Sequence, residues 1–154
     1  MLDALLLACA PLIAPDTAAA LISVESRANP YAIGVFAGHL DRQPRNLLEA
    51  VATAHALEAA GWNYSVGLAQ INKANFARHG LSIETAFDPC SNLRAMQSIL
   101  GECFGRASVR TEPQVALRRA FSCYYSGNFQ TGFQHGYVQK VVAAWKDGAS
   151  RSQR

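Results

Sequence analysis

The stretch "PDTAAALISVESRANP", Pro15 to Pro30, combines a helix-forming run with one misplaced charge. Asp16 after Pro15 is a candidate N-cap, and the pair Asn29-Pro30 predicts where the helix stops. Apolar residues follow one face at helical spacing, and the next position on that face is Glu25, three residues after Ile22. The stripe consists of Ala18, Leu21 and Ile22. A carboxyl where the pattern calls for an apolar residue marks a candidate functional site.

Burial determines what such a carboxyl can do. An apolar environment disfavours the charged form and raises the pKa, so the group can stay protonated near neutral pH and donate a proton to a leaving oxygen. Glu25 is therefore a candidate general acid. The alternative is an ordinary carboxylate at a helix end, paired with Arg27 or another base.

A second unusual stretch is "GWNYSVGLAQINKANF", Gly61 to Phe76, where amide side chains lie among aromatic rings. Amides can bind the hydroxyl and acetamido groups of a sugar while rings stack on its flat faces. The same composition also fits a polar turn. Trp62, Tyr64 and Phe76 fit either a stacking surface or the core.

Helical patterns cover most of the remaining chain, and no long β run is present. Asn46 and Glu49 form a capping-box pattern for a helix that Gly61 ends. The class expected is mainly α, as a single domain with at most a small β hairpin or loop pair near residues 31–41 and 62–70. The other expected helices cover residues 2–10, 71–80, 88–103 with an inner face of Leu93, Met96, Ile99, Leu100 and Cys103, 111–128 with a stripe of Leu117, Ala120, Phe121 and Tyr124, and 136–145 with Val138, Val141, Val142 and Trp145 facing inward.

Composition excludes several classes of protein. Half of the 154 residues are hydrophobic, 16% are charged, and the net charge of +3 is mild. No basic stripe interleaved with aromatic residues suggests nucleic acid, and no apolar run has the length of a membrane span. The apolar start is too short, and lacks the basic residues, for a typical signal peptide. The end of the chain, residues 147–154, is expected to be a solvated basic tail after a domain over residues 1–146.

The four cysteines are Cys9, Cys90, Cys103 and Cys123. Neither they nor the four histidines have zinc-ligand spacing, so no metal site is expected. At least one disulfide is expected, with four buried thiols as the alternative. Thirteen residues of straight helix span roughly 20 Å, so Cys90 and Cys103 should pair only if their helix is broken, and Cys9 or Cys123 are better partners.

Three motifs together carry a resemblance that no one of them would establish: "ES" at Glu25-Ser26, "GLAQIN" at Gly67 to Asn72, and "CYYSGN" at Cys123 to Asn128. In this order they resemble the motifs of the soluble lytic transglycosylases, which share the goose-type lysozyme fold. The chain is also similar, over most of residues 9–142, to the transglycosylase subunit of type IV secretion systems.

The resemblance implies roles for individual residues. Glu25 matches the single catalytic acid, Ser26 matches the serine that supports the following turn, and Tyr124 matches the tyrosine that bonds the catalytic carboxyl. The substrate-binding positions implied are Gly67, Ala69, Gln70, Asn72 and Tyr125, with Gln70 facing the glycan. Two departures stand out: Ala69 replaces a frequent methionine, and Tyr125 replaces the usual asparagine.

The resemblance implies cleavage of peptidoglycan between N-acetylmuramic acid and N-acetylglucosamine, with a 1,6-anhydro product, in the periplasm and without a cofactor. Other type IV secretion subunits are possible partners. A hydrolytic lysozyme on the same fold and a catalytically silent peptidoglycan-binding module are alternatives. A peptidase using Cys123 or Cys90 lacks a nucleophile signature.

Overall fold

The computed structural model describes residues 1–154 as a mainly helical fold with one small sheet, which confirms the expected class. The helices are α1 (Leu2–Cys9), α2 (Pro15–Ser26), α3 (Leu47–Ala59), α4 (Ile83–Ala86), α5 (Pro89–Ala107), α6 (Pro113–Ser126), α7 (Thr131–Gln134) and α8 (Tyr137–Ser152). The sheet is antiparallel with the order β1 (Ile33–Val35), β2 (Tyr64–Val66) and β3 (Ile71–Asn72), one strand more than the expected hairpin.

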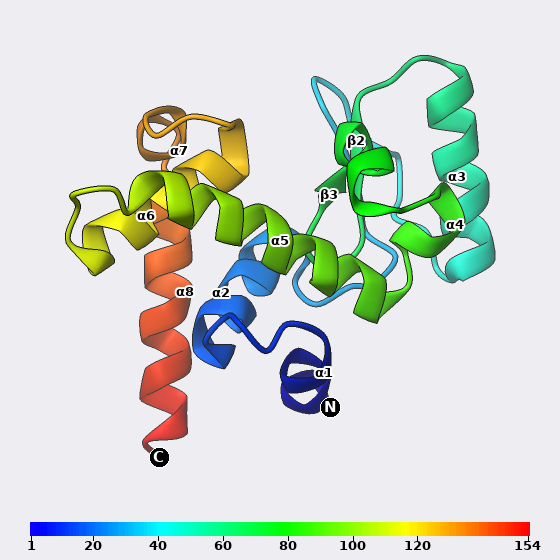
Figure 1. Ribbon diagram of the computed structural model, residues 1–154. Helices are drawn as coiled ribbons and strands as arrows, with labels where there is room; N and C mark the ends of the chain where they lie inside the picture. Colours follow the sequence, from blue (N-terminus) through cyan, green and yellow to red (C-terminus); the bar gives the residue numbers. More distant parts are fainter.

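Helix α5 crosses the middle of the molecule and divides it into two sides (Figure 1). The sheet, α3 and α4 lie on one side, and α6, α7 and α8 lie on the other. The face of α5 expected to point inward is buried along its length, from Leu93 to Cys103. Helix α5 is continuous across this face. Asp88 caps its start, and Pro89 occupies the first helical position, where proline costs no hydrogen bond.

Two hydrophobic clusters fill the two sides, and α2 contributes to both. Ala18 and Ile22 belong to the cluster under the sheet, while Ala20 and Leu21 belong to the cluster between α5, α6 and α8. Because α2 is buried on two faces, its last turn ends between the two sides of the molecule. Glu25 belongs to this last turn and therefore lies at the boundary between the two sides.

Helix ends differ from the sequence expectations in a few places. Asp16 is not the N-cap of α2: the cap is Ala14, because Pro15 fits the first helical position, and this leaves Asp16 in the first turn, where a carboxylate is favourable. The helix ends three residues before Asn29, since Arg27 adopts the left-handed conformation with a φ of 53°. Asn46 caps α3 as expected, but Glu49 accepts its hydrogen bond from the backbone of Arg45, so the reciprocal half of the capping box is absent.

Two of the helices expected from the sequence also differ in the structure. The expected helix over residues 71–80 is strand β3 followed by two 3₁₀ turns, Lys73–Asn75 and Ala77–His79, ended by Gly80. In α8, Val138 and Val141 are buried as expected, whereas Trp145 is 44% exposed, because the helix extends beyond the cluster it covers. Residues 147–152 form the last turns of α8 rather than starting after it.

Two disulfides connect segments that are distant in sequence. Cys9 of α1 is joined to Cys90 at the start of α5, with Cα atoms 5.2 Å apart, and Cys103 of α5 is joined to Cys123 of α6, with Cα atoms 5.7 Å apart. This confirms the expectation of at least one disulfide, and Cys90 and Cys103 pair with Cys9 and Cys123, as expected for an unbroken helix between them. It also leaves Cys90 and Cys123 without the free thiol that a cysteine peptidase requires. None of the helices combines the length and apolar character needed to cross a membrane.

Candidate active site

A cleft of about 1340 Å³ runs between the sheet side and the α6–α7 side of the molecule, along α5. Glu25, Gln70, Asn72, Tyr124 and Tyr125 all line it, which brings five of the sequence-predicted site residues together. These residues come from α2, the segment around β3, and α6. Only the tertiary packing of these elements makes them one surface.

Glu25 is the half-buried carboxyl at the centre of this arrangement. Burial raises its pKa from the ordinary value of 4.5 to about 7, and a hydrogen bond from Tyr137 opposes part of that rise. It takes part in no ion pair, so the alternative of a structural salt bridge with Arg27 is wrong. At neutral pH a substantial fraction of Glu25 is protonated, as a general acid requires.

The tyrosine that binds Glu25 is Tyr137, not Tyr124. The Tyr137 hydroxyl donates to Glu25 Oε1 over 2.5 Å, from the first turn of α8. The ring of Tyr137 is buried and stacks on Tyr125, with centroids 4.6 Å apart and an angle of 16° between the planes. This packing restricts the ring, so the hydroxyl is held against the carboxyl. Sequence reasoning missed Tyr137; the available signal was a tyrosine at the start of a helix whose next turn is buried.

Tyr124 has a different task from the one expected. Its hydroxyl donates to the backbone carbonyl oxygen of Ala69 over 2.7 Å, so it links α6 to the "GLAQ" segment instead of bonding the acid. Tyr124 and Glu25 both line the cleft, and burial first and the negative charge of Glu25 second raise the pKa of the Tyr124 hydroxyl well above its ordinary value.

Ser26 also supports the "GLAQ" segment, from the residue after the acid. Its Oγ donates to the carbonyl oxygen of Leu68 over 2.7 Å. The last turn of α2 and the segment from Gly67 to Gln70 are thereby tied together. The role that the resemblance implied for Ser26 was support of the turn after its helix, whereas this bond reaches the "GLAQ" segment.

Gly67 and Ala69 do not line the cleft, and their contribution comes from the backbone. Gly67 has a φ of 81°, and a side chain there would collide with the amide of Asn92. The fully buried Asn92 accepts from the Ala69 amide and donates to the carbonyl oxygens of Val66 and Ala86. These three bonds fix the loop, and sequence reasoning did not single out Asn92.

Gln70 is held in a conformation uncommon for residues other than glycine, with a φ of 50°. Its Nε2 donates to the carbonyl oxygens of Ala32 and Gly67, both over 3.0 Å. The Oε1 atom lies against Gly34, where an added Cβ would be only 2.7 Å away. The amide therefore lies in the cleft wall in one orientation, next to strand β1.

The other predicted residues differ in their burial and in the partners they bind. Asn72 donates to Asn63 Oδ1 and Ser65 Oγ, and caps the following turn through Oδ1. Tyr125 is 45% exposed and its hydroxyl meets His135 Nδ1 at 3.0 Å. Tyr64 and Phe76 are core residues packed edge to face, whereas Trp62 is exposed.

The chain is similar in sequence to proteins named virB1. The chain is 53% identical over 143 residues to the type IV secretion system protein virB1 of Brucella suis biovar 1 (strain 1330), covering 88% of this chain and 60% of that protein. It is 37% identical over 136 residues to protein virB1 of Agrobacterium fabrum (strain C58 / ATCC 33970), covering 88% of this chain and 56% of the relative. The chain thus spans less than two thirds of the length of these relatives. No solved structure matches it.

The residues that line the cleft lie inside the region of the chain that matches one domain family. The profile of that family, described as the transglycosylase SLT domain, matches residues 7–150. This range contains every residue of the cleft and both disulfides. The chain therefore belongs to the transglycosylase SLT domain family.

Proposed function

We propose that the protein is a peptidoglycan lytic transglycosylase that cleaves the β-1,4 bond between N-acetylmuramic acid and N-acetylglucosamine and leaves a 1,6-anhydro end. The observation that carries this proposal is the Glu25 carboxyl, which lines the cleft without an ion pair and has a pKa raised to about 7. A carboxyl with this pKa can act as an acid and then, once ionised, as a base within one turnover.

Glu25 would protonate the glycosidic oxygen. The negative charge that this leaves on the carboxylate is stabilised by the Tyr137 hydroxyl, which already donates to Oε1. The 2-acetamido oxygen of the substrate would stabilise the cationic sugar carbon. The Glu25 carboxylate would then remove the proton from the muramyl 6-hydroxyl, whose oxygen attacks C1 and closes the anhydro ring.

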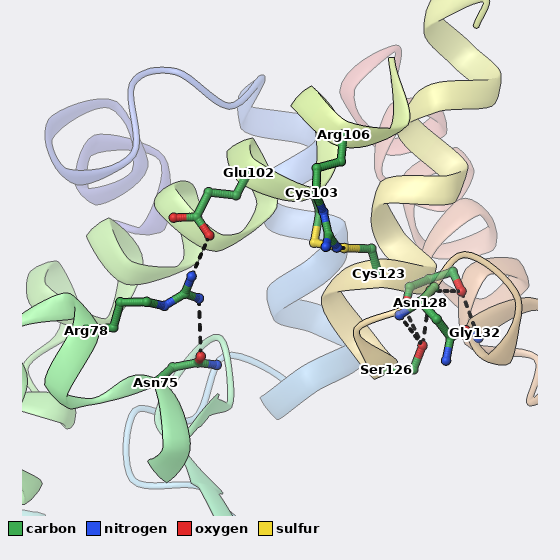
Figure 2. The surroundings of a disulfide bond; sticks show 10 residues. Asn75, Arg78, Glu102, Cys103, Arg106, Cys123, Ser126, Asn128 and Gly132 are labelled. Atoms are coloured by element: carbon green, nitrogen blue, oxygen red, sulfur yellow. Dashed lines mark hydrogen bonds and ion pairs between the residues drawn. A yellow bond between two sulfur atoms is a disulfide. The ribbon is translucent and has the colours of Figure 1, made fainter. Parts of the chain in front are cut away.

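The composition of the cleft favours this route over one with two carboxylates. Ordinary glycosidases use a second carboxylate as nucleophile or base. Besides Glu25, the acidic residue that lines the cleft is Glu102, which is turned toward Arg78 and paired with it over 2.9 Å (Figure 2). An internal hydroxyl as nucleophile makes a second free carboxylate unnecessary.

The substrate contacts belong to the same proposal. Gln70, Asn72 and Tyr125 line the cleft and would face the glycan, Gln70 with its amide held by two backbone carbonyls. Ser26, Gly67, Ala69 and Tyr124 would act by fixing the loop that carries Gln70.

The relatives named as type IV secretion proteins support a role in opening the cell wall for such an apparatus. Peptidoglycan as substrate, and two disulfides that suit an oxidising compartment, support a periplasmic location. Partners would be glycan strands and other subunits of the secretion system.

Product analysis tests the proposal. Purified peptidoglycan is digested with the protein and with its Glu25→Gln variant, and the soluble muropeptides are analysed by mass spectrometry. We expect anhydro-muropeptides from the wild type and essentially none from the variant. Reducing ends would identify a hydrolytic lysozyme instead, and binding without products would identify a silent binding module.

A further inference from the structure

The wall of the cleft formed by the second half of α5 carries a cation that no other group in the protein neutralises. Glu102, Cys103 and Arg106 of this helix all line the cleft. Figure 2 shows Glu102 directed toward Arg78 and Arg106 directed toward the Cys103–Cys123 disulfide. The two charged residues are four apart on the helix, close enough to pair, and yet they do not.

Glu102 is engaged elsewhere. Its Oε2 accepts from Arg78 Nη1 over 2.9 Å, and Arg78 Nη2 also donates to Asn75 Oδ1 over 3.3 Å. The Arg78–Glu102 pair therefore carries no net charge. The positive charge of Arg106 is left uncompensated on the same wall.

Neutral groups hold the Arg106 side chain in place. Nη2 lies 2.7 Å from Cys123 Sγ, and the guanidinium carbon lies 5.8 Å from the centroid of the Phe129 ring. A disulfide sulfur and an aromatic ring orient a guanidinium without neutralising it. Because only part of the donor fork is used, the rest of it remains available to an anion.

Arg106 and Glu25 line the same cleft. Cys123, whose sulfur Arg106 contacts, directly precedes Tyr124, and both residues line the cleft. A glycan strand that passes Glu25 along the cleft would thus pass Arg106 at the neighbouring part of the wall. The sugar rings of peptidoglycan are uncharged, but muramic acid carries a lactyl group, which ends either in a free carboxylate or in a peptide stem that bears carboxylates.

We propose that Arg106 binds a carboxylate carried by the muramic acid side chain of the substrate, so that the cleft distinguishes peptidoglycan from uncharged N-acetylglucosamine polymers. The inference rests on the proposed function, because it concerns the substrate of the same cleft. The guanidinium is held for a charge-assisted, two-pronged contact, which arginine makes with carboxylates.

Binding can be measured without cleavage if every protein carries Glu25→Gln. Three ligands separate the possible sources of the carboxylate: soluble glycan strands that bear peptide stems, the same strands after an amidase has removed the stems and exposed the lactyl carboxylate, and N-acetylglucosamine oligomers of similar length. We expect Arg106→Gln to weaken binding of at least one carboxylate-bearing strand by about 3- to 10-fold, the range for a partly exposed arginine–carboxylate contact. Binding of the uncharged oligomers should not change. The strand that is weakened identifies the source.

Arg94→Gln is the matched control, because it removes one positive charge from an exposed position on the same helix, outside the cleft. It should bind all three ligands like its parent. Arg106→Lys keeps the charge and should recover part of the affinity lost in Arg106→Gln.

Unchanged binding of both carboxylate-bearing strands by Arg106→Gln would overturn the inference while leaving the proposed function intact. Equal weakening of all three ligands, with a lower midpoint of thermal unfolding, would also overturn it and would show that Arg106 only supports the disulfide. If the protein without these changes neither binds nor cleaves peptidoglycan, the proposed function fails, and the inference fails with it.

Discussion

Replacing Glu25 by glutamine should remove catalysis and, at neutral and alkaline pH, make the protein more stable. The amide has the size of the carboxyl, and its oxygen can still accept the hydrogen bond that the Tyr137 hydroxyl donates to Glu25 Oε1. Only the transferable proton and the charge are lost. Loss of a general acid typically costs roughly 10²- to 10⁴-fold in rate.

The gain in stability follows from the pKa of Glu25 in the folded protein, which burial raises from 4.5 to about 7. Ionising the carboxyl in the folded state therefore costs more than ionising it in the unfolded chain, by about 1.36 kcal/mol for each pKa unit, or roughly 3 kcal/mol in total. Below pH 4.5 both states are protonated and the penalty is absent. It grows as pH rises from 4.5 to 7 and is complete above 7.

Chemical unfolding of the wild type and the variant between pH 4 and pH 8.5 measures this difference directly. Glu25→Gln should unfold with nearly the wild-type free energy at pH 4 and with a free energy higher by up to about 3 kcal/mol at pH 8. Asp147→Asn removes an exposed carboxylate from α8 and controls for the loss of a negative charge. A difference between Glu25→Gln and wild type that does not depend on pH would refute the assignment of a raised pKa to Glu25.

Three further changes test other parts of the site. Tyr137→Phe keeps the stacked ring but removes the hydroxyl that stabilises the Glu25 carboxylate, so the pKa of Glu25 should rise. The alkaline limb of the pH–rate profile should then shift to higher pH, and the rate should fall by roughly 10-fold; an unchanged profile would contradict this. Gly34→Ala places a Cβ 2.7 Å from Gln70 Oε1 and should raise KM by up to roughly 10-fold with little change in the thermal midpoint, whereas an unchanged KM would mean that Gln70 does not contact the glycan. Removing the Cys9–Cys90 disulfide by a double alanine replacement should lower the free energy of unfolding by about 4.5 kcal/mol, because the two cysteines are 81 positions apart in the sequence; a loss below about 1 kcal/mol in urea unfolding would contradict this.

Local patterns in the sequence were sufficient to predict most of the helices and the unusual position of the Glu25 carboxyl. The apolar stripe of α2 placed Glu25 on a buried face because helical spacing is set by neighbouring residues, and the inner face of α5 was correct for the same reason. Helix geometry also excluded a Cys90–Cys103 disulfide. The three motifs indicated which family uses such an acid, and the match to the SLT domain confirms that family.

The partner of the acid could be identified only in the tertiary structure. Tyr124 lies on the apolar stripe of α6 and Tyr137 begins α8, and nothing local distinguishes which of the two hydroxyls reaches the Glu25 carboxyl, 112 residues away from Tyr137 in the sequence. In the folded chain, the Tyr124 hydroxyl donates to the Ala69 carbonyl oxygen, while the packing of α8 against α2 places the Tyr137 hydroxyl at Glu25.

The orientation of Gln70 and the position of Arg106 likewise depend on contacts between separate segments: Gln70 is held by the carbonyl oxygens of Ala32 and Gly67, and Arg106 contacts a disulfide that joins two helices. The sequence by itself determined most of the helices and which one carries Glu25, because hydrophobic periodicity and capping act over a few residues. The packing of α2, α5, α6 and α8 decided what surrounds that acid, because a hydrogen bond forms only where the whole fold places its donor and acceptor together.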